Sequence, residues 1–184
     1  MNINSYENSS FIYGPGERFI IWTQGCSIRC KGCWNEKMHS FKKVNEIGCK
    51  ELLKLVVDSE VKGVTFLGGE PFDQYKELLE IAKKLYELNI SVIIFSGYEK
   101  FELIRDEKNE IFKYIDILIY GRYVESKRNI NLQWRGSENQ VVDFLSDRYS
   151  EKELIDGNYV EIIIENDGSL KILGFPEKIE ELVK

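Results

Sequence analysis

Three cysteines, Cys26, Cys30 and Cys33, lie within eight residues of one another. Thiolates this close together can converge on one metal centre, and soft sulfur ligands favour zinc, copper(I) or iron–sulfur clusters. In a cluster of four irons, three cysteines leave one iron open, and an open iron can bind a substrate. The alternative is a structural zinc site, in which Cys49 or His39 would supply the fourth ligand of a tetrahedral set.

A second group of residues that could bind a ligand follows the apolar run at residues 64–67. It consists of Gly68, Gly69 and Glu70. Paired glycines at the carboxyl end of a strand let a ligand approach the backbone closely. Glu70 adds a carboxylate that can accept hydrogen bonds from an ammonium group. Taken alone, the same residues also fit a tight strand-to-helix turn with a solvated glutamate.

The elements that must position these residues alternate along the chain. The apolar patterns predict strands over residues 19–22, 64–67, 90–95 and 115–120, and helices over residues 45–58, 75–88 and 101–105. Alternating strands and helices imply parallel pairing with right-handed crossovers, so the class is α/β. Ligands gather at the carboxyl ends of such strands. Cys26, Gly69, Ser96 and residues 120–122 all fall there.

The C-terminal stretch contains a hairpin signal. Two β-branched or apolar runs, residues 159–165 and 169–173, flank an Asp-Gly pair, and a short acidic helix is expected over residues 177–183. An isolated hairpin is only marginally stable, so we expect it to pack on the main sheet or on a partner. We therefore expect a core domain over residues 1–150 and an extension over residues 151–184 packed on the same domain.

Composition excludes several classes of protein. The chain has 184 residues, 43% of them hydrophobic and 30% charged, which is typical of a single soluble globular domain. A net charge of −6 argues against a nucleic-acid partner. No apolar run reaches membrane-spanning length and the first residues lack a signal-peptide pattern, so we expect no membrane association and a cytoplasmic location. Cys49 is expected to be a small packing residue.

Two motifs together resemble those of the radical S-adenosylmethionine (SAM) enzymes. The spacing C-x3-C-x2-C followed by Trp34 is similar to their signature loop, and Gly68-Gly69-Glu70-Pro71 is similar to the motif that holds the methionine end of SAM. The resemblance implies a [4Fe–4S] cluster on Cys26, Cys30 and Cys33, with SAM on the open iron. Reductive cleavage of SAM would then give a 5′-deoxyadenosyl radical. It also implies an incomplete (βα) barrel with a C-terminal β-hairpin extension, and a SAM pocket formed by Gly32, Trp34, Gly68, Gly69, Glu70, Ser96 and Arg122.

Further segments resemble the activating proteins of anaerobic ribonucleotide reductases. These are the turn over residues 14–18, Ser96-Gly97-Tyr98 and the Trp-Arg-Gly-Ser-x-Asn-Gln segment from Trp134, so the resemblance spans residues 10–145. It implies an activase that installs a glycyl radical on a partner such as anaerobic ribonucleoside-triphosphate reductase, with flavodoxin or ferredoxin as electron donor. Tyr120 departs from the family, which has aspartate there, and the chain continues beyond the family's usual end.

Two alternatives remain open at the level of sequence. One is a divergent radical SAM enzyme that acts on another protein, a peptide or a small molecule. The other is a non-enzymatic zinc or iron–sulfur interaction module, which the Gly-Gly-Glu-Pro motif disfavours.

Overall fold

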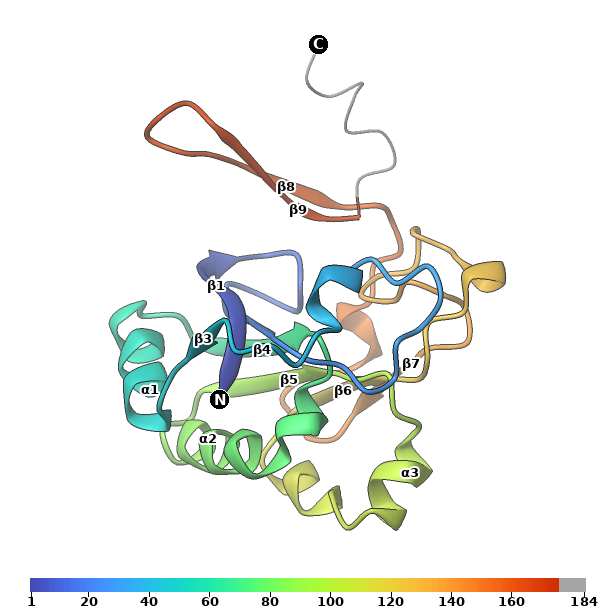
Figure 1. Ribbon diagram of the computed structural model, residues 1–184, viewed down its shortest axis with the longest axis horizontal. Helices are drawn as coiled ribbons and strands as arrows, with labels where there is room; N and C mark the ends of the chain where they lie inside the picture. The colour runs from blue at the N-terminus through green and yellow to red at the C-terminus, as the bar shows by residue number, and fades with distance from the viewer. Residues whose placement is uncertain (176–184) are drawn as a thin grey trace.

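The computed structural model describes residues 1–175, so the helix expected over residues 177–183 lies outside the described residues. A seven-stranded sheet forms its centre, in the order β3-β1-β2-β4-β5-β6-β7 (Figure 1). The four inner strands are parallel, and β1, β3 and β7 add antiparallel edges. Their bounds are β1 (Asn2–Ser10), β2 (Arg18–Thr23), β3 (Asn45–Glu46), β4 (Gly63–Gly68), β5 (Ser91–Phe95), β6 (Ile117–Tyr120) and β7 (Val141–Phe144).

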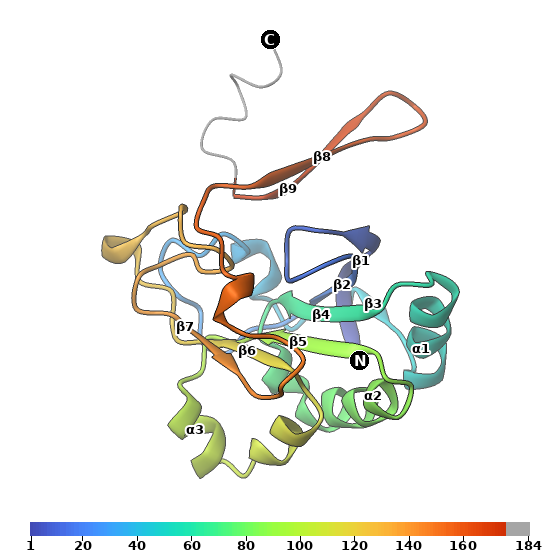
Figure 2. The same cartoon turned by 180° about the vertical axis from the view of Figure 1, so that it is seen from behind.

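Helices cover one face of this sheet (Figures 1 and 2). The α-helices are α1 (Cys49–Asp58), α2 (Tyr75–Glu87) and α3 (Lys100–Arg105), and the 3-10 turns are η1 (Glu36–Met38), η2 (Pro71–Gln74), η3 (Asn109–Lys113), η4 (Glu125–Lys127) and η5 (Glu151–Glu153). The apolar stripe of α2 packs Leu78, Ile81 and Leu85 into the main core beneath the sheet. Burial of such stripes, spaced three and four residues apart, holds the helices to the strands.

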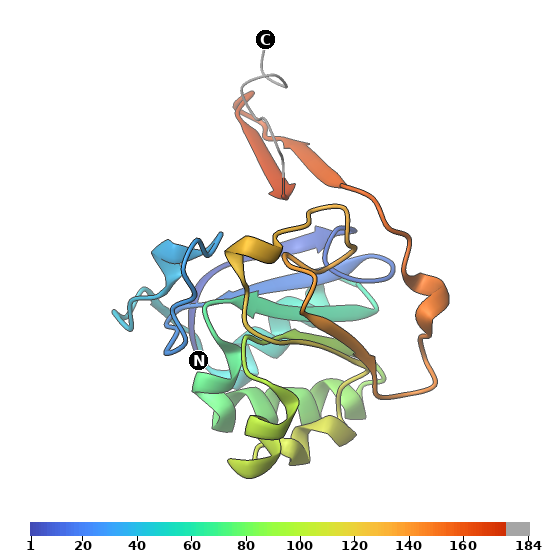
Figure 3. The same ribbon diagram turned by 90° about the vertical axis from the view of Figure 1, so that its right-hand side faces the viewer.

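Loops and a separate hairpin cover the opposite face. The hairpin consists of β8 (Val160–Ile164) and β9 (Leu170–Gly174), and in Figure 3 it stands above the sheet on the side away from the helices. It is tied to the sheet by Leu173, which is buried in a cluster with Tyr13, Ile20, Trp22 and Leu67. The Tyr13 hydroxyl also accepts a hydrogen bond of 3.0 Å from the Gly174 N–H. Leu173 and Gly174 thus hold one end of the hairpin against the main sheet.

Arg18 fastens the amino ends of three parallel strands. Its guanidinium is buried at the start of β2 and donates to the Val64 carbonyl, the Thr65 hydroxyl and both the hydroxyl and carbonyl of Ser91 at 2.8–3.1 Å. Burial lowers the pKa of this guanidinium. Since the cysteines follow the other end of β2, Arg18 lies at the edge of the sheet opposite them.

The α/β class expected from the sequence is confirmed, and each strand and helix predicted up to residue 173 is present within a few residues of its expected bounds. The antiparallel strands β1, β3 and β7 were not expected. β1 reads Asn-Ile-Asn-Ser-Tyr-Glu-Asn-Ser-Ser, with too few apolar residues to predict a strand, and its pairing with β2 determines its conformation. Across residues 1–175, no helix is both long and apolar enough to span a bilayer.

Candidate functional site

The cysteine loop leaves the carboxyl end of β2 and is shaped by residues with left-handed backbone angles. Gly25 has φ 101°, Arg29 52° and Gly32 71°, so the chain turns back on itself between the cysteines. The loop is held at its start, where the N–H of Gly25 donates to the Met38 carbonyl at 2.9 Å. All three thiols are free of disulfides, and all three line a single cavity.

Backbone N–H groups are directed at the cysteine sulfurs. Burial raises the pKa of the Cys26 thiol, while the N–H groups of Arg29 and Ile28 lower it. Burial likewise raises the pKa of Cys33, and the Asn35 N–H opposes it. Hydrogen bonds to the sulfurs are one of the means by which proteins tune an iron–sulfur cluster. Three free thiols that line one cavity, two of them with N–H donors, fit a cluster with one open iron.

The glycine pair after β4 lies against the cysteine loop. A Cβ on Gly69 would come 2.2 Å from the Gly25 carbonyl oxygen, and one on Gly68 would come 2.7 Å from the Thr23 nitrogen. The close approach allows two backbone hydrogen bonds of 2.8 Å, from Gly69 N–H to the Thr23 carbonyl and from Glu70 N–H to the Gly25 carbonyl. The glycines therefore bring two loops of the chain together, a role that the sequence did not suggest.

Glu70 is buried, with a carboxylate that faces the same cavity. One oxygen, Oε1, accepts from the Phe72 N–H at 3.0 Å and from the Ser96 hydroxyl at 2.9 Å, and Oε2 accepts from the Gly97 N–H at 2.8 Å. Burial raises the pKa of Glu70 to about 7, even though these three donors act to lower it. A carboxylate has about four acceptor sites, so Oε2 can accept one further hydrogen bond.

A hydrogen-bonded group fixes the residue that follows Cys26. The Ser27 N–H and hydroxyl donate to the two oxygens of the Asp73 carboxylate at 2.7 and 2.9 Å, and the Tyr98 hydroxyl donates to the same carboxylate at 2.8 Å. These residues come from the cysteine loop, from η2 and from the loop after β5. Sequence reasoning missed Ser27 and Asp73, since no spacing rule links them.

The cavity extends from the cysteines across the face of the sheet away from the helices, and its volume is about 200 Å³. The residues expected at the site that line it are Cys26, Cys30, Cys33, Gly68, Gly69, Glu70 and Ser96. They come from the loops after β2, β4 and β5. The structure thus brings together the two motifs and the strand-end serine, as expected for parallel strands with a shared carboxyl edge.

Three residues expected in the pocket are not among those that line the cavity. Gly32 turns toward η4, where an added Cβ would meet the Glu125 carboxyl group. Trp34 is 53% exposed and packs edge-on against Phe175, with ring centroids 5.6 Å apart. Arg122 forms a bidentate pair with Glu102 of α3 at 2.6 and 2.9 Å, which holds the pKa of that carboxyl down to about 2.

The zinc alternative gains no support from the geometry. Cys49 begins α1 and packs against the core on the helical face, away from the cysteine loop, which agrees with the packing role expected for it. His39 lines the cavity, but within residues 1–175 no three His, Cys, Asp or Glu side chains are grouped closely enough to hold a single metal ion. Cluster ligands lie farther apart than the ligands of one ion.

The segment from Trp134 has both structural and cavity-facing residues. The side-chain amides of Asn139 and Gln140 donate to the carbonyls of Arg122 and Gly121 at 2.8 and 3.0 Å, which fixes the loop after β6. Trp134 is buried and lines the cavity, with a left-handed φ of 60°. Its indole N–H has no acceptor among the described residues. A strained backbone and an unpaired buried donor are typical of functional sites.

The comparisons with known proteins first define the class. Residues 12–143 match the family model of the 4Fe-4S single cluster domain. This match includes the cysteine loop, the glycine pair and Trp134. The class therefore accounts for the three free thiols on one cavity wall.

Curated relatives define the family more closely. The anaerobic ribonucleoside-triphosphate reductase-activating protein of Pasteurella multocida is 32% identical over 152 residues, which cover 77% of this chain and 96% of the relative. The proteins of the same name from Enterobacteria phage T4 and Haemophilus influenzae are 31% and 28% identical, over 76% and 77% of this chain and 92% and 97% of their own lengths. The chain belongs to this family of reductase-activating proteins.

Proposed function

We propose that this chain is a radical SAM activase that installs a glycyl radical on an anaerobic ribonucleoside-triphosphate reductase. The observation that carries the proposal is the single cavity shared by Cys26, Cys30 and Cys33 with the Gly68–Glu70 turn. The names of the relatives support the reductase as the partner. The iron–sulfur class of the family model supports the cluster.

In this proposal Cys26, Cys30 and Cys33 hold a [4Fe–4S] cluster, and SAM binds beside it. When bound and reduced, the cluster would supply one electron to SAM. The C5′–S bond of SAM would then break to give methionine and a 5′-deoxyadenosyl radical, which would take a hydrogen atom from the target glycine. The chain orients SAM through Glu70, whose Oε2 has room for one more donor, such as the ammonium group of SAM. Ser96 holds the other carboxylate oxygen in place.

The remaining parts of the proposal concern architecture and electron supply. We infer that the four parallel strands represent an incomplete (βα) barrel and that residues 1–150 form the catalytic domain, with residues 151–184 as an extension. The electron donor is a small redox protein such as flavodoxin or ferredoxin.

The proposal is tested by electron paramagnetic resonance. The protein is reconstituted with iron and sulfide without oxygen, reduced with dithionite, and mixed with SAM and the anaerobic reductase encoded in the same genome. We expect about four irons per chain, the composition of a cubane, and a glycyl-radical doublet on the reductase. SAM cleavage without any doublet would overturn the reductase as substrate and would favour a divergent radical SAM enzyme.

Two cysteine variants serve as a matched pair. Cys30→Ala should lose the cluster and the doublet, because it removes one of three thiols on the cavity wall. Cys49→Ala should keep both, since Cys49 packs on the helical face of the sheet. Loss of the cluster in Cys49→Ala, or one tightly bound zinc per chain in the unaltered protein, would contradict the assignment.

A further inference from the structure

The C-terminal extension adds a wall to the cavity that holds the cysteines. Gly157, Asn158, Tyr159 and Phe175 line this cavity together with Cys26, Cys30 and Cys33. The extension lies beyond the family match, which ends at residue 143. In the Pasteurella multocida comparison, 77% of this chain accounts for 96% of the relative. The wall residues therefore lie outside the part of the chain that matches the family model.

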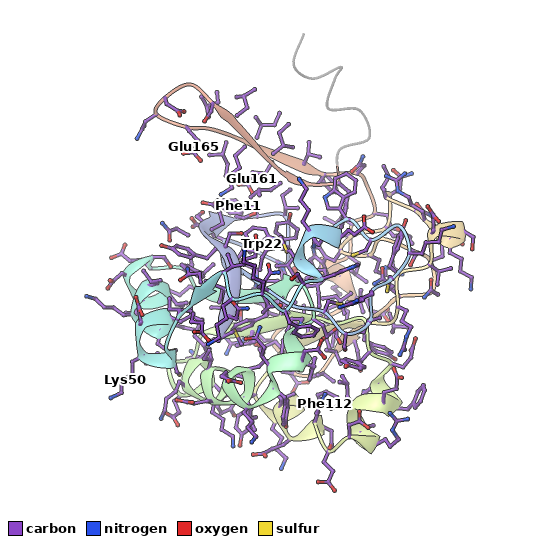
Figure 4. All side chains as sticks on the ribbon, in the orientation of Figure 1. Phe11, Trp22, Lys50, Phe112, Glu161 and Glu165 are labelled. Atoms are coloured by element: carbon purple, nitrogen blue, oxygen red, sulfur yellow. The ribbon has the colours of Figure 1, made fainter. Side chains whose placement is uncertain are left out.

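Specific contacts hold the extension against two loops that also line the cavity. At the first loop, the Glu161 carboxylate accepts from the Ser10 hydroxyl at 2.5 Å and from the Phe11 N–H at 3.3 Å, and Figure 4 shows Phe11 below Glu161, between the hairpin and the sheet. At the second loop, the Gly157 N–H donates to the Asn131 carbonyl at 2.7 Å. The Ile155 N–H donates to the Gln133 side chain at 2.5 Å. These contacts fix the position of the wall.

Aromatic side chains of the extension and of the loop after β1 line the cavity. Tyr159 is 52% exposed and Phe11 is 61% exposed, although both line the cavity. Phe175 also lines it and packs against the exposed Trp34, next to Cys33. Exposed aromatic side chains of this kind are enriched where proteins bind other proteins, because they bury a large area at a small entropic cost.

Trp134 and Asn158, which both line the cavity, carry polar side-chain groups. The buried indole N–H of Trp134 has no acceptor among residues 1–175. The side-chain amide of Asn158 can both donate and accept. Exposed aromatic side chains beside polar groups that can both donate and accept hydrogen bonds are found in interfaces that bind protein segments.

We propose that residues 157–159 and Phe175, together with Trp134, bind the glycine-containing segment of the protein substrate as it enters the cavity. This inference rests on the proposed function, because it assigns the residues that recognise the same substrate. The extension then acts as a specificity element that selects the reductase.

The test compares Tyr159→Ala and Asn158→Ala with the unaltered holoprotein. Two rates are measured: 5′-deoxyadenosine release without reductase, and glycyl-radical formation as the reductase concentration is varied. We expect the KM for the reductase to rise about tenfold in Tyr159→Ala, the usual effect of truncating a central interface aromatic. This rise should exceed any change in 5′-deoxyadenosine release. Tyr159→Phe should restore most of the affinity.

The matched control is Ile164→Ser on the same hairpin. Ile164 is 73% exposed and is not among the residues that line the cavity, so both rates should remain as in the unaltered protein. An unchanged KM in Tyr159→Ala and Asn158→Ala would overturn the inference. If the unaltered protein still forms the doublet, the proposed function is upheld in that case. A loss of 5′-deoxyadenosine release as large as the loss of activation would also overturn the inference. That result would mean that these residues act on SAM and not on the protein substrate. If the unaltered protein forms no doublet, the proposed function itself fails.

Discussion

At the scale of single residues, the site depends on two glycines that permit one loop to touch another. Gly69 lies so close to the Gly25 carbonyl that any side chain would push the cysteine loop away. The glycines of this motif thus have two effects. They let the cysteine loop lie close to the loop after β4, and they leave room for a ligand. The position of the cysteine loop after β2 therefore depends on its contact with the loop after β4.

Gly69→Ala should therefore lose most of its iron. The added Cβ at 2.2 Å from the Gly25 oxygen breaks the two 2.8 Å backbone bonds that fix the loop. Iron and sulfide content after anaerobic reconstitution measures the effect. Gly48→Ala is the matched control, because a Cβ there has nothing within 4 Å, and it should load normally. Full iron content in Gly69→Ala would show that the close approach does not position the cysteines.

Glu70 should make stability depend on pH. Its pKa is raised to about 7, above the value of 4.5 in an unfolded chain, chiefly by burial. The folded state then holds a proton that the unfolded state releases, so the free energy of unfolding falls as pH rises from about 4.5 to about 7. Between about pH 6 and about pH 8 the expected loss is on the order of 1 kcal/mol.

Urea unfolding of the protein and of Glu70→Gln at both pH values measures this difference. The glutamine variant keeps the shape of the side chain but does not titrate, so its stability should change less over the same range. Equal pH dependence in the two proteins would mean that the Glu70 carboxyl has an ordinary pKa.

Among the elements, the parallel strands are held together at both ends, by a different kind of interaction at each end. Loops with close backbone contacts join their carboxyl ends at the site, and the buried Arg18 joins their amino ends. The arginine of the turn before β2 therefore supports the sheet and lies away from the cavity. A buried cation that donates to several carbonyls cannot be replaced without leaving those carbonyls unpaired.

Arg18→Met should lower the free energy of unfolding by about 3 kcal/mol or more, because Val64, Thr65 and Ser91 each lose a buried donor. Denaturant unfolding measures the loss. Arg105→Met is the control, since that side chain is 67% exposed, and its effect should remain within about 0.5 kcal/mol. A similar small effect for both variants would show that water replaces the guanidinium in the sheet.

At the scale of the whole molecule, the extension has two roles. Leu173 completes the cluster on the open face of the sheet, and residues 157–159 reach the cavity. From the sequence we expected the hairpin to pack on the main sheet or on a partner, and residues 157–159 were not placed at the cavity. Its contact with the cavity was missed because nothing in the spacing of residues 157–159 links them to the cysteines.

A chain that ends at Ser150 should still bind the cluster, because the cysteines and the glycine pair precede that point. It should be less stable, since burial of a leucine such as Leu173 contributes about 1.5–3 kcal/mol. Thermal unfolding and iron content measure the two effects. It should also cleave SAM when reduced, while activation of the reductase falls. A folded, iron-loaded truncate that releases no 5′-deoxyadenosine would show that the extension is part of the SAM site.

Local chemistry and the main secondary-structure elements could be predicted from the amino-acid sequence. Three cysteines on one short loop remain neighbours in any fold, so their spacing predicted a shared centre. Apolar periodicity predicted the central strands and the helices, because burial of one face enforces it. The Asp-Gly pair predicted the hairpin, whose Gly168 has a φ of 83°.

Only the tertiary structure decided the features that depend on distant partners. The polar strand β1 forms because β2 offers it an edge, and Arg122 turns to Glu102 because α3 lies beside it. The left-handed Trp134 and the wall at Tyr159 reach the cavity through loops whose path no local pattern encodes. Contacts between residues far apart in sequence form only when the whole chain packs. Burial of apolar surface brings the distant segments together, and no local sequence pattern contains that information.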